Sequence, residues 1–190
     1  YAQRGRRRLK PIFETYLRRP GALPRALTCI RWPLRPILQY LIIFRSFGHK
    51  DAMLRRILEA YEALGFVETD RRRLRSLFWW VRAEGARCLG QMKCHAAKPD
   101  LLRRLKDPVL EVRLLSAWAL GRLGDPDTLF AIIDALANSS RVAAMRLSST
   151  VFEIGPASVD PLIAILGNKE PATRLLALHL LGELGDDKAL

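Results

Sequence analysis

Apolar residues recur at helical spacing along most of this chain, and one stretch of the pattern repeats. Residues 80–90, WVRAEGARCLG, return 31 residues later as EVRLLSAWALG at 111–121. Two periods further on they return as ATRLLALHLLG at 172–182, whereas VAAMRLSSTVF at 142–152 keeps the apolar spacing but lacks the arginine and glycine at their positions. A fixed period of this length is typical of stacked helical units that together bury one continuous core.

The residues between these copies predict a pair of antiparallel helices in each repeat. The first pair, from near Val67, combines a short helix at 70–74 with a longer helix that starts at Ser76. The predicted fold is therefore all-α, an α-solenoid over 67–190 that is expected to continue past residue 190. Further helices are predicted at 99–106 with 109–123, at 127–137 with 139–154, at 158–166 with 169–184, and from near Asp187.

Residues that start helices support the same register. Serine, aspartate and asparagine side chains accept a hydrogen bond from the free backbone N–H groups at the beginning of a helix. Residues of these types recur at steps of 30 or 31, as Ser76, Asp107, Asn138 and Asn168. Each of the four is therefore predicted to cap the second helix of its repeat.

Small residues mark two further positions. Glycine favours the left-handed conformation that ends a helix, and Gly124, Gly155 and Gly185 are predicted to have this role. Inside a helix glycine costs about 0.5–1 kcal/mol relative to alanine, so small residues that recur there are expected to let neighbouring helices approach closely. They are Ala86, Ala117 and Ser148 at one position, and Gly90, Gly121 and Gly182 at another.

Residues 1–66 predict a separate, irregular helical region that links to the array. Pro11 suits the first turn of a short helix that ends at Arg19, and prolines between 22 and 36 interrupt regular structure. Residues 37–44 are apolar on nearly every side, which indicates a helix that is buried, packed on a partner, or lying in a membrane interface. Residues 51–64 predict an amphipathic helix ended by Gly65.

The net charge of +13 is unevenly placed along the chain. Residues 1–82 hold 19 Lys and Arg against 6 Asp and Glu, whereas residues 83–190 hold 13 of each. An excess confined to one half indicates either an anionic partner there or a solubilising surface.

Two basic clusters are the candidates for contact with an anionic surface. They are Arg4, Arg6, Arg7, Arg8 and Lys10, and then Arg71, Arg72 and Arg75. The N-terminal cluster suits the cytoplasmic flank of a membrane helix lying before residue 1, with anionic lipid as its ligand, but also a nucleic-acid-binding arm or a disordered tail. The cluster at 71–75 suits either a solvated face or contact with phosphates of lipid or nucleic acid.

Four residues of the repeats are candidates for contact with a protein partner. Arg82 and Arg113 recur in register with Arg174, so they are expected either to pair with acids or carbonyls of the adjacent repeat or to bind a ligand. Trp79 and Trp80 start a helix, where one can face the core and the other cannot easily do so; they are interpreted as packing residues or as an exposed contact.

No catalytic, cofactor or metal site is predicted. Cys29, Cys88 and Cys94 are an odd number without disulfide-like spacing, which fits a reducing compartment, and the Cys94-His95 pair has no second pair to complete a metal site. There is no glycine-rich phosphate loop and no arrangement of Ser, His and Asp. The most apolar run, 36–44, is far shorter than the roughly 20 residues that span a bilayer.

The repeated pattern, Val-Arg followed by Ala and then Leu-Gly, resembles the short HEAT-like repeats first associated with phycobilin lyases. This resemblance covers 67–190, and it implies a stacked binding surface rather than a site. The His-Glu pairs of deoxyhypusine hydroxylase are absent. The matches are Val81-Arg82, Ala86 and Leu89-Gly90, then Val112-Arg113, Ala117 and Leu120-Gly121, and in part Thr173-Arg174 with Leu181-Gly182.

The order of features is also similar to bacterial membrane-anchored HEAT-repeat proteins, with a basic neck and a helical linker before the repeats. That resemblance implies an anchor before residue 1, a position at the cytoplasmic face of the membrane, and a protein partner in the membrane or in envelope biosynthesis. The expected function is a non-enzymatic scaffold or adaptor without a cofactor. The alternative is a nucleic-acid-binding solenoid that uses residues 4–10 and 71–75.

Overall fold

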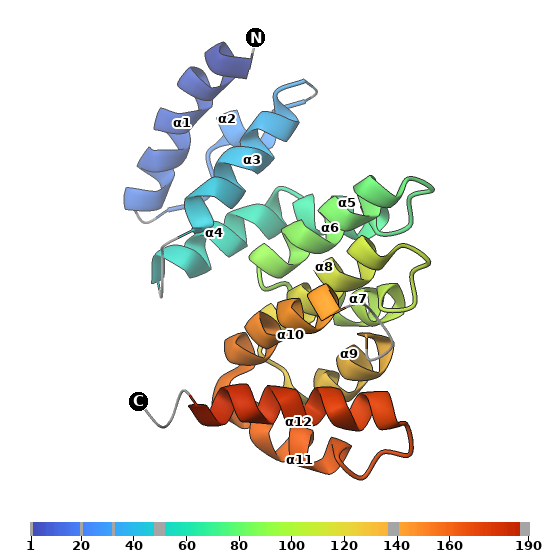
Figure 1. Ribbon diagram of the computed structural model, residues 1–190. Helices are drawn as coiled ribbons and strands as arrows, with labels where there is room; N and C mark the ends of the chain where they lie inside the picture. The colour runs from blue at the N-terminus through green and yellow to red at the C-terminus, as the bar shows by residue number, and fades with distance from the viewer. Residues whose placement is uncertain (1, 20, 32, 48–51, 137–140, 187–190) are drawn as a thin grey trace. The chain divides into compact units, whose positions relative to one another are not determined.

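The computed structural model describes residues 2–19, 21–31, 33–47, 52–136 and 141–186, and all regular structure within these ranges is helical (Figure 1). The chain divides into two compact units, Tyr1–Thr69 and Asp70–Leu190.

The first unit begins with helix α1, Ala2–Arg18, which continues past Pro11 without interruption. The prediction that the helix starts at Pro11 is therefore wrong. Proline inside a helix removes a hydrogen bond and costs about 3 kcal/mol, but Leu9 and Phe13 continue one buried stripe on both sides of it. A Cβ on Gly5 would lie 2.8 Å from Leu34 Cδ2, so the N-terminal half of α1 is also packed closely.

Helices α2 (Arg25–Thr28), α3 (Arg35–Ser46) and α4 (Ala52–Ala63) complete this unit, and α5 (Phe66–Arg73) begins in it. Ile42 and Ile57 are fully buried, and Gln39 Nε2 donates a 2.7 Å hydrogen bond to the buried Tyr61 hydroxyl. The amphipathic helix at 51–64 is confirmed. Gly65, at φ 70°, ends it as predicted.

The second unit contains the predicted helix pairs, so the all-α solenoid is confirmed for the described residues. Boundaries agree to within a few residues, and the helix expected near Asp187 lies outside those residues. The elements are α6 (Trp79–Gln91), α7 (Lys98–Arg104), α8 (Leu110–Leu123), α9 (Leu129–Leu136), α10 (Arg141–Ile154), α11 (Val159–Ile165) and α12 (Pro171–Asp186), with short 3₁₀ turns at His95–Ala97, Pro126–Thr128 and Gly155–Ser158.

Glycines set how closely the second helices of successive repeats approach. A Cβ on Gly90 would lie 2.6 Å from Ala119 Cα, and one on Gly121 would lie 2.3 Å from Thr150 Cγ2. Both distances are far inside van der Waals contact, so the predicted packing role is confirmed at these two positions. It is not found at Gly182, where no atom lies within 4 Å. Phe152 occupies the equivalent position of α10 and is exposed.

The residues predicted to start and end helices have mixed outcomes. Gly124 and Gly155 have φ of 71° and 78°, as expected of helix ends, but Gly185 lies inside α12, because glycine permits the left-handed conformation without requiring it. Ser76 and Asp107 accept hydrogen bonds from the N–H two residues ahead, as Asn168 does.

These bonds close the turn before each helix, and helices α6, α8 and α12 begin three residues after Ser76, Asp107 and Asn168. The predicted N–H partnership is therefore present, but the N-cap position is wrong. Asn138 lies outside the described residues.

Candidate interaction surfaces

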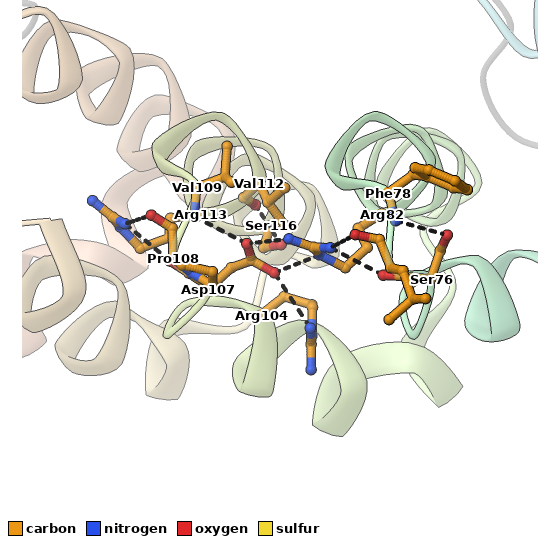
Figure 2. A network of polar contacts seen from close by, with 11 residues as sticks. Ser76, Phe78, Arg82, Arg104, Asp107, Pro108, Val109, Val112, Arg113 and Ser116 are labelled. Atoms are coloured by element: carbon orange, nitrogen blue, oxygen red, sulfur yellow. Dashed lines mark hydrogen bonds and ion pairs between the residues drawn. The ribbon is translucent and has the colours of Figure 1, made fainter.

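The arginine that recurs in the repeats holds the turn of its own repeat. Arg82 Nη1 donates to the Ser76 and Leu77 carbonyls at 3.0 and 2.9 Å, and Figure 2 shows this bonding beside that of Arg113. These carbonyl acceptors lie six and five residues earlier in the same repeat, whereas the prediction placed the partners in the adjacent repeat; for Arg82 the bond to Asp107 confirms that prediction. The other bonds run from Arg113 to Asp107 and Pro108 at 2.9 and 3.3 Å, and from Arg174 to Asn168 and Lys169 at 2.9 and 3.0 Å.

Arg82 alone among these arginines also reaches a carboxylate of the next repeat within the part of the chain that the structure describes. Its Nε and Nη2 donate to Asp107 Oδ2 and Oδ1 at 2.7 and 2.8 Å, and Arg104 approaches the same carboxylate at 3.3 Å (Figure 2). Arg82 is 8% exposed and Asp107 is 3% exposed. Burial and this bonding favour a structural role for Arg82 over contact with a partner.

Ionisation of the pair follows from its surroundings. Burial opposes the charged form of Asp107, but hydrogen bonds from Arg82 and the Val109 N–H, with the charges of Arg82 and Arg104, outweigh it and hold the pKa of Asp107 below its usual value. The hydrogen bond to Asp107 also raises the pKa of Arg82. The pair is therefore ionised at neutral pH.

Asp100 is a second buried carboxylate with several cations around it. Arg71 Nε donates to it at 2.7 Å, Arg103 Nη2 at 2.5 Å, and Arg75 Nη2 lies 3.7 Å away. Burial opposes ionisation, but the Arg71 hydrogen bond and the charges of Arg71, Arg103 and Arg75 lower the pKa of Asp100. The basic cluster that includes Arg72 is thus partly engaged within the array, although Arg72 and Arg75 are exposed to solvent.

We expect the stability of the chain to fall when the solution is acidified below about pH 4. The folded-state pKa values of Asp100 and Asp107 lie below the unfolded value of about 3.9, so the unfolded chain takes up protons first. Their contribution is therefore complete above that value and is lost as the pH falls through the folded-state pKa values. Urea unfolding between pH 7 and pH 3 tests this; an Asp107→Asn variant that keeps the full pH dependence would contradict the role of Asp107.

Four ion pairs between successive repeats run in one direction. In each of them the cation lies in the earlier repeat and the carboxylate in the later one. The separations are 29, 25, 27 and 31 residues, for Arg71–Asp100, Arg82–Asp107, Lys98–Asp125 and Arg122–Glu153.

Four consecutive exposed apolar residues cover the end of the connection between α5 and α6 and the first two residues of α6. We call them the aromatic turn: Leu77, Phe78, Trp79 and Trp80. Their exposed fractions are 95%, 56%, 43% and 54%. This exposure favours an exposed contact over packing, the two alternatives that the sequence left open for the tryptophans. Leu77 and Phe78 were not predicted as candidates. The register aligns Leu77 with Pro108 and Lys169, and Phe78 with Val109 and Glu170, none of which is aromatic.

Two of the N-terminal cations, Arg6 and Lys10, lie beside aromatic residues of α3. Arg4, Arg6, Arg7, Arg8 and Lys10 are all exposed on α1. The Arg6 guanidinium lies 5.0 Å from the centre of the exposed Tyr40 ring.

A small hollow between the same helices is lined by Lys10, Phe44 and Arg45, and Arg45 pairs with Glu14 at 3.2 Å. We call the surface formed by Arg6, Lys10, Tyr40 and Phe44 the α1–α3 face. The sequence contained one signal for it, the spacing of four between Tyr40 and Phe44, but not the helix that would lie beside them.

Some classes of site have no counterpart in the described ranges. No helix there is long and apolar enough to cross a bilayer, and no three His, Cys, Asp or Glu side chains there gather as metal ligands do. Cys88 is buried, and its burial with the nearby charges of Asp70 and Glu84 raises the pKa of the thiol, so Cys88 is not a reactive thiolate.

A family model for HEAT repeats matches residues 71–149. Residues 71–149 of the array are therefore similar to HEAT repeats. The match begins in α5 and extends into α10, and so includes the arginine-held turns and the aromatic turn. No curated protein matches the chain. HEAT repeats stack into extended surfaces that typically bind other proteins, which makes the outer surface of the HEAT array the first place to expect a partner.

Proposed function

We propose that this chain is a non-enzymatic scaffold that binds a protein partner through its HEAT array and contacts an anionic membrane surface through the α1–α3 face. The observation that carries the proposal is the juxtaposition of exposed cations on α1 with exposed aromatic rings on α3. The cytoplasmic face of a bacterial membrane and a partner in envelope biosynthesis are the more specific form of this proposal.

The array supports a scaffold because its recurring charged residues serve the fold. Arg82 and Asp107 satisfy one another, and Arg113 holds the backbone of its own turn. A repeat surface of this kind supplies many shallow contacts to a partner rather than a convergent set of reactive groups.

The α1–α3 face has the chemistry of a peripheral membrane contact. Each Lys or Arg near an anionic bilayer contributes about 1 kcal/mol, and aromatic rings favour the interfacial region of the bilayer. Arg6 and Lys10 supply the electrostatic attraction to the lipid, and Tyr40 and Phe44 supply the aromatic rings for the interfacial region. A nucleic-acid-binding solenoid is less well supported, because the positive charge does not continue along the array: residues 114–190 hold 6 Lys and Arg against 9 Asp and Glu.

Co-sedimentation with vesicles of phosphatidylcholine and phosphatidylserine tests the proposal. We expect the whole chain to bind at low salt and to be released at high salt. An Arg6→Gln/Lys10→Gln variant is expected to bind about thirtyfold more weakly, from two lost contacts of about 1 kcal/mol each.

The matched control is Arg4→Gln/Arg8→Gln, which removes the same charge from α1 but leaves Arg6 over Tyr40. An equal loss in both variants would mean that only net charge matters and that the α1–α3 face is wrongly assigned. Failure of the unaltered chain to bind these vesicles at low salt would overturn the membrane contact, and duplex DNA and RNA would then be the next ligands to try.

A further inference from the structure

The aromatic turn has no counterpart in the other repeats. In register, residues 77–80 read LFWW, whereas 108–111 read PVLE and 169–172 read KEPA. The turns at 108–111 and 169–172 keep the same arginine-held backbone without aromatic side chains, so the fold itself does not require aromatic residues here. Exposed apolar clusters that the fold does not need are commonly contact sites.

The backbone of the aromatic turn is also fixed by hydrogen bonds. Arg82 donates to the carbonyls of Ser76 and Leu77 and is itself held by both oxygens of Asp107. The Phe78 N–H donates to Ser76 Oγ at 3.2 Å. The apolar side chains are therefore presented to solvent on a backbone that is tied to the next repeat.

Positive charge surrounds this turn. Residues 70–113 hold 12 Lys and Arg against 5 Asp and Glu, a net charge of +7, whereas residues 114–190 hold 6 against 9, a net charge of −3. Asp100 and Asp107 are buried, and each lies among two or more arginines. The exposed charged residues of 70–113 are thus mostly cationic. Arg72, Arg75, Lys93, Arg103 and Lys106 are exposed, and Glu84 on α6 is the exposed acid among them.

We infer that the aromatic turn inserts into the interfacial region of an anionic phospholipid bilayer. Tryptophan and phenylalanine favour this region, and adjacent arginines meet the phosphates of the headgroups. The contact residues are separate from the α1–α3 face, and the inference rests on the proposed function only in sharing its membrane.

The geometry of the rings favours lipid over single-stranded nucleic acid. Phe78 and Trp80 stack on one another with ring centres 4.8 Å apart, and Trp79 and Trp80 form a T-shaped pair with ring centres 6.1 Å apart. Their faces are therefore partly used, whereas nucleic-acid bases need a free ring face on which to stack. The 95% exposure of Leu77 describes a projecting apex, which suits insertion into a bilayer.

Vesicle binding by variants of the whole chain tests this inference. We expect Leu77→Ser/Phe78→Ser to weaken binding to phosphatidylcholine–phosphatidylserine vesicles about tenfold or more, because two exposed apolar side chains lose their burial in lipid. Phe130→Ser is the matched control: Phe130 is 52% exposed on α9, outside the turn, and its replacement is expected to leave binding unchanged.

Tryptophan quenching by brominated acyl chains provides a second, independent readout. Vesicles of the same composition but with brominated phosphatidylcholine are expected to quench the emission of the unaltered chain. A Trp79→Phe/Trp80→Phe variant keeps aromatic side chains in the turn, so it is expected to remain bound but to lose most of this quenching.

Three results would overturn the inference. Unchanged binding by Leu77→Ser/Phe78→Ser would leave the turn as a surface for a protein partner. Binding without quenching would place Trp79 and Trp80 outside the bilayer. A lower melting temperature of Leu77→Ser/Phe78→Ser without vesicles would mean that the turn packs against the chain itself.

The same variants separate this inference from the proposed function. Loss of binding only in Arg6→Gln/Lys10→Gln would preserve the α1–α3 contact and remove the aromatic turn. Loss only in Leu77→Ser/Phe78→Ser would do the reverse.

Discussion

Replacing Arg82 with alanine is expected to lower the free energy of unfolding by about 3–5 kcal/mol. The substitution leaves the buried Asp107 carboxylate without its two strongest hydrogen bonds and frees the carbonyls of Ser76 and Leu77. A buried charge that loses its partner is costly because the protein interior solvates it poorly. Urea unfolding followed by circular dichroism measures the loss.

Arg174→Ala is the matched control for this prediction. Arg174 has the same register and the same two carbonyl bonds, but it is exposed and, among the described residues, has no carboxylate partner. We expect its replacement to cost about 1 kcal/mol or less. Equal losses in the two variants would mean that the carbonyl bonds, rather than the ion pair with Asp107, account for the effect of Arg82.

Replacing the inter-helix glycines with alanine is expected to have opposite effects at different repeats. Gly90→Ala and Gly121→Ala should each destabilise the array by about 1–3 kcal/mol, because the new methyl group would meet Ala119 or the backbone of Thr150. Gly182→Ala should instead stabilise it by about 0.5–1 kcal/mol, since alanine is the better helix former and no atom lies within 4 Å. Thermal unfolding of the three variants measures both signs.

These variants share one chemical change, so whether the stability rises or falls depends only on how closely the neighbouring helix approaches. Stabilisation by Gly121→Ala would show that α8 and α10 do not approach as closely as the structure indicates. Destabilisation by Gly182→Ala would mean that another segment packs against α12 at that position.

Periodicity made the fold predictable because each repeat solves the same packing problem locally. The turn residues Ser76 and Asp107 could be located from their spacing, since a side chain that bonds the N–H two residues ahead needs no knowledge of the rest of the chain. The exact helix start could not, because α6 and α8 begin only after that turn closes.

Contacts across repeats and between helices were less predictable. The pattern indicated that Arg82 would meet an acid or a carbonyl, but a separation of 25 residues to Asp107 is not a multiple of the repeat. This separation arises because Arg82, on the second helix of its repeat, contacts the turn at Asp107 before the second helix of the next repeat. The juxtaposition of Arg6 and Tyr40 depends on how α1 packs against α3, which neither segment encodes by itself.

The four ion pairs that run in the same direction between repeats favour a stack that is polar from head to tail. A cation on the outgoing side of one repeat meets a carboxylate on the incoming side of the next. Two incoming sides, or two outgoing sides, would bring like charges together, which disfavours inverted pairing. Repeats of this array are thus expected to join in one orientation only, and an inserted repeat would have to keep that orientation in order to stack.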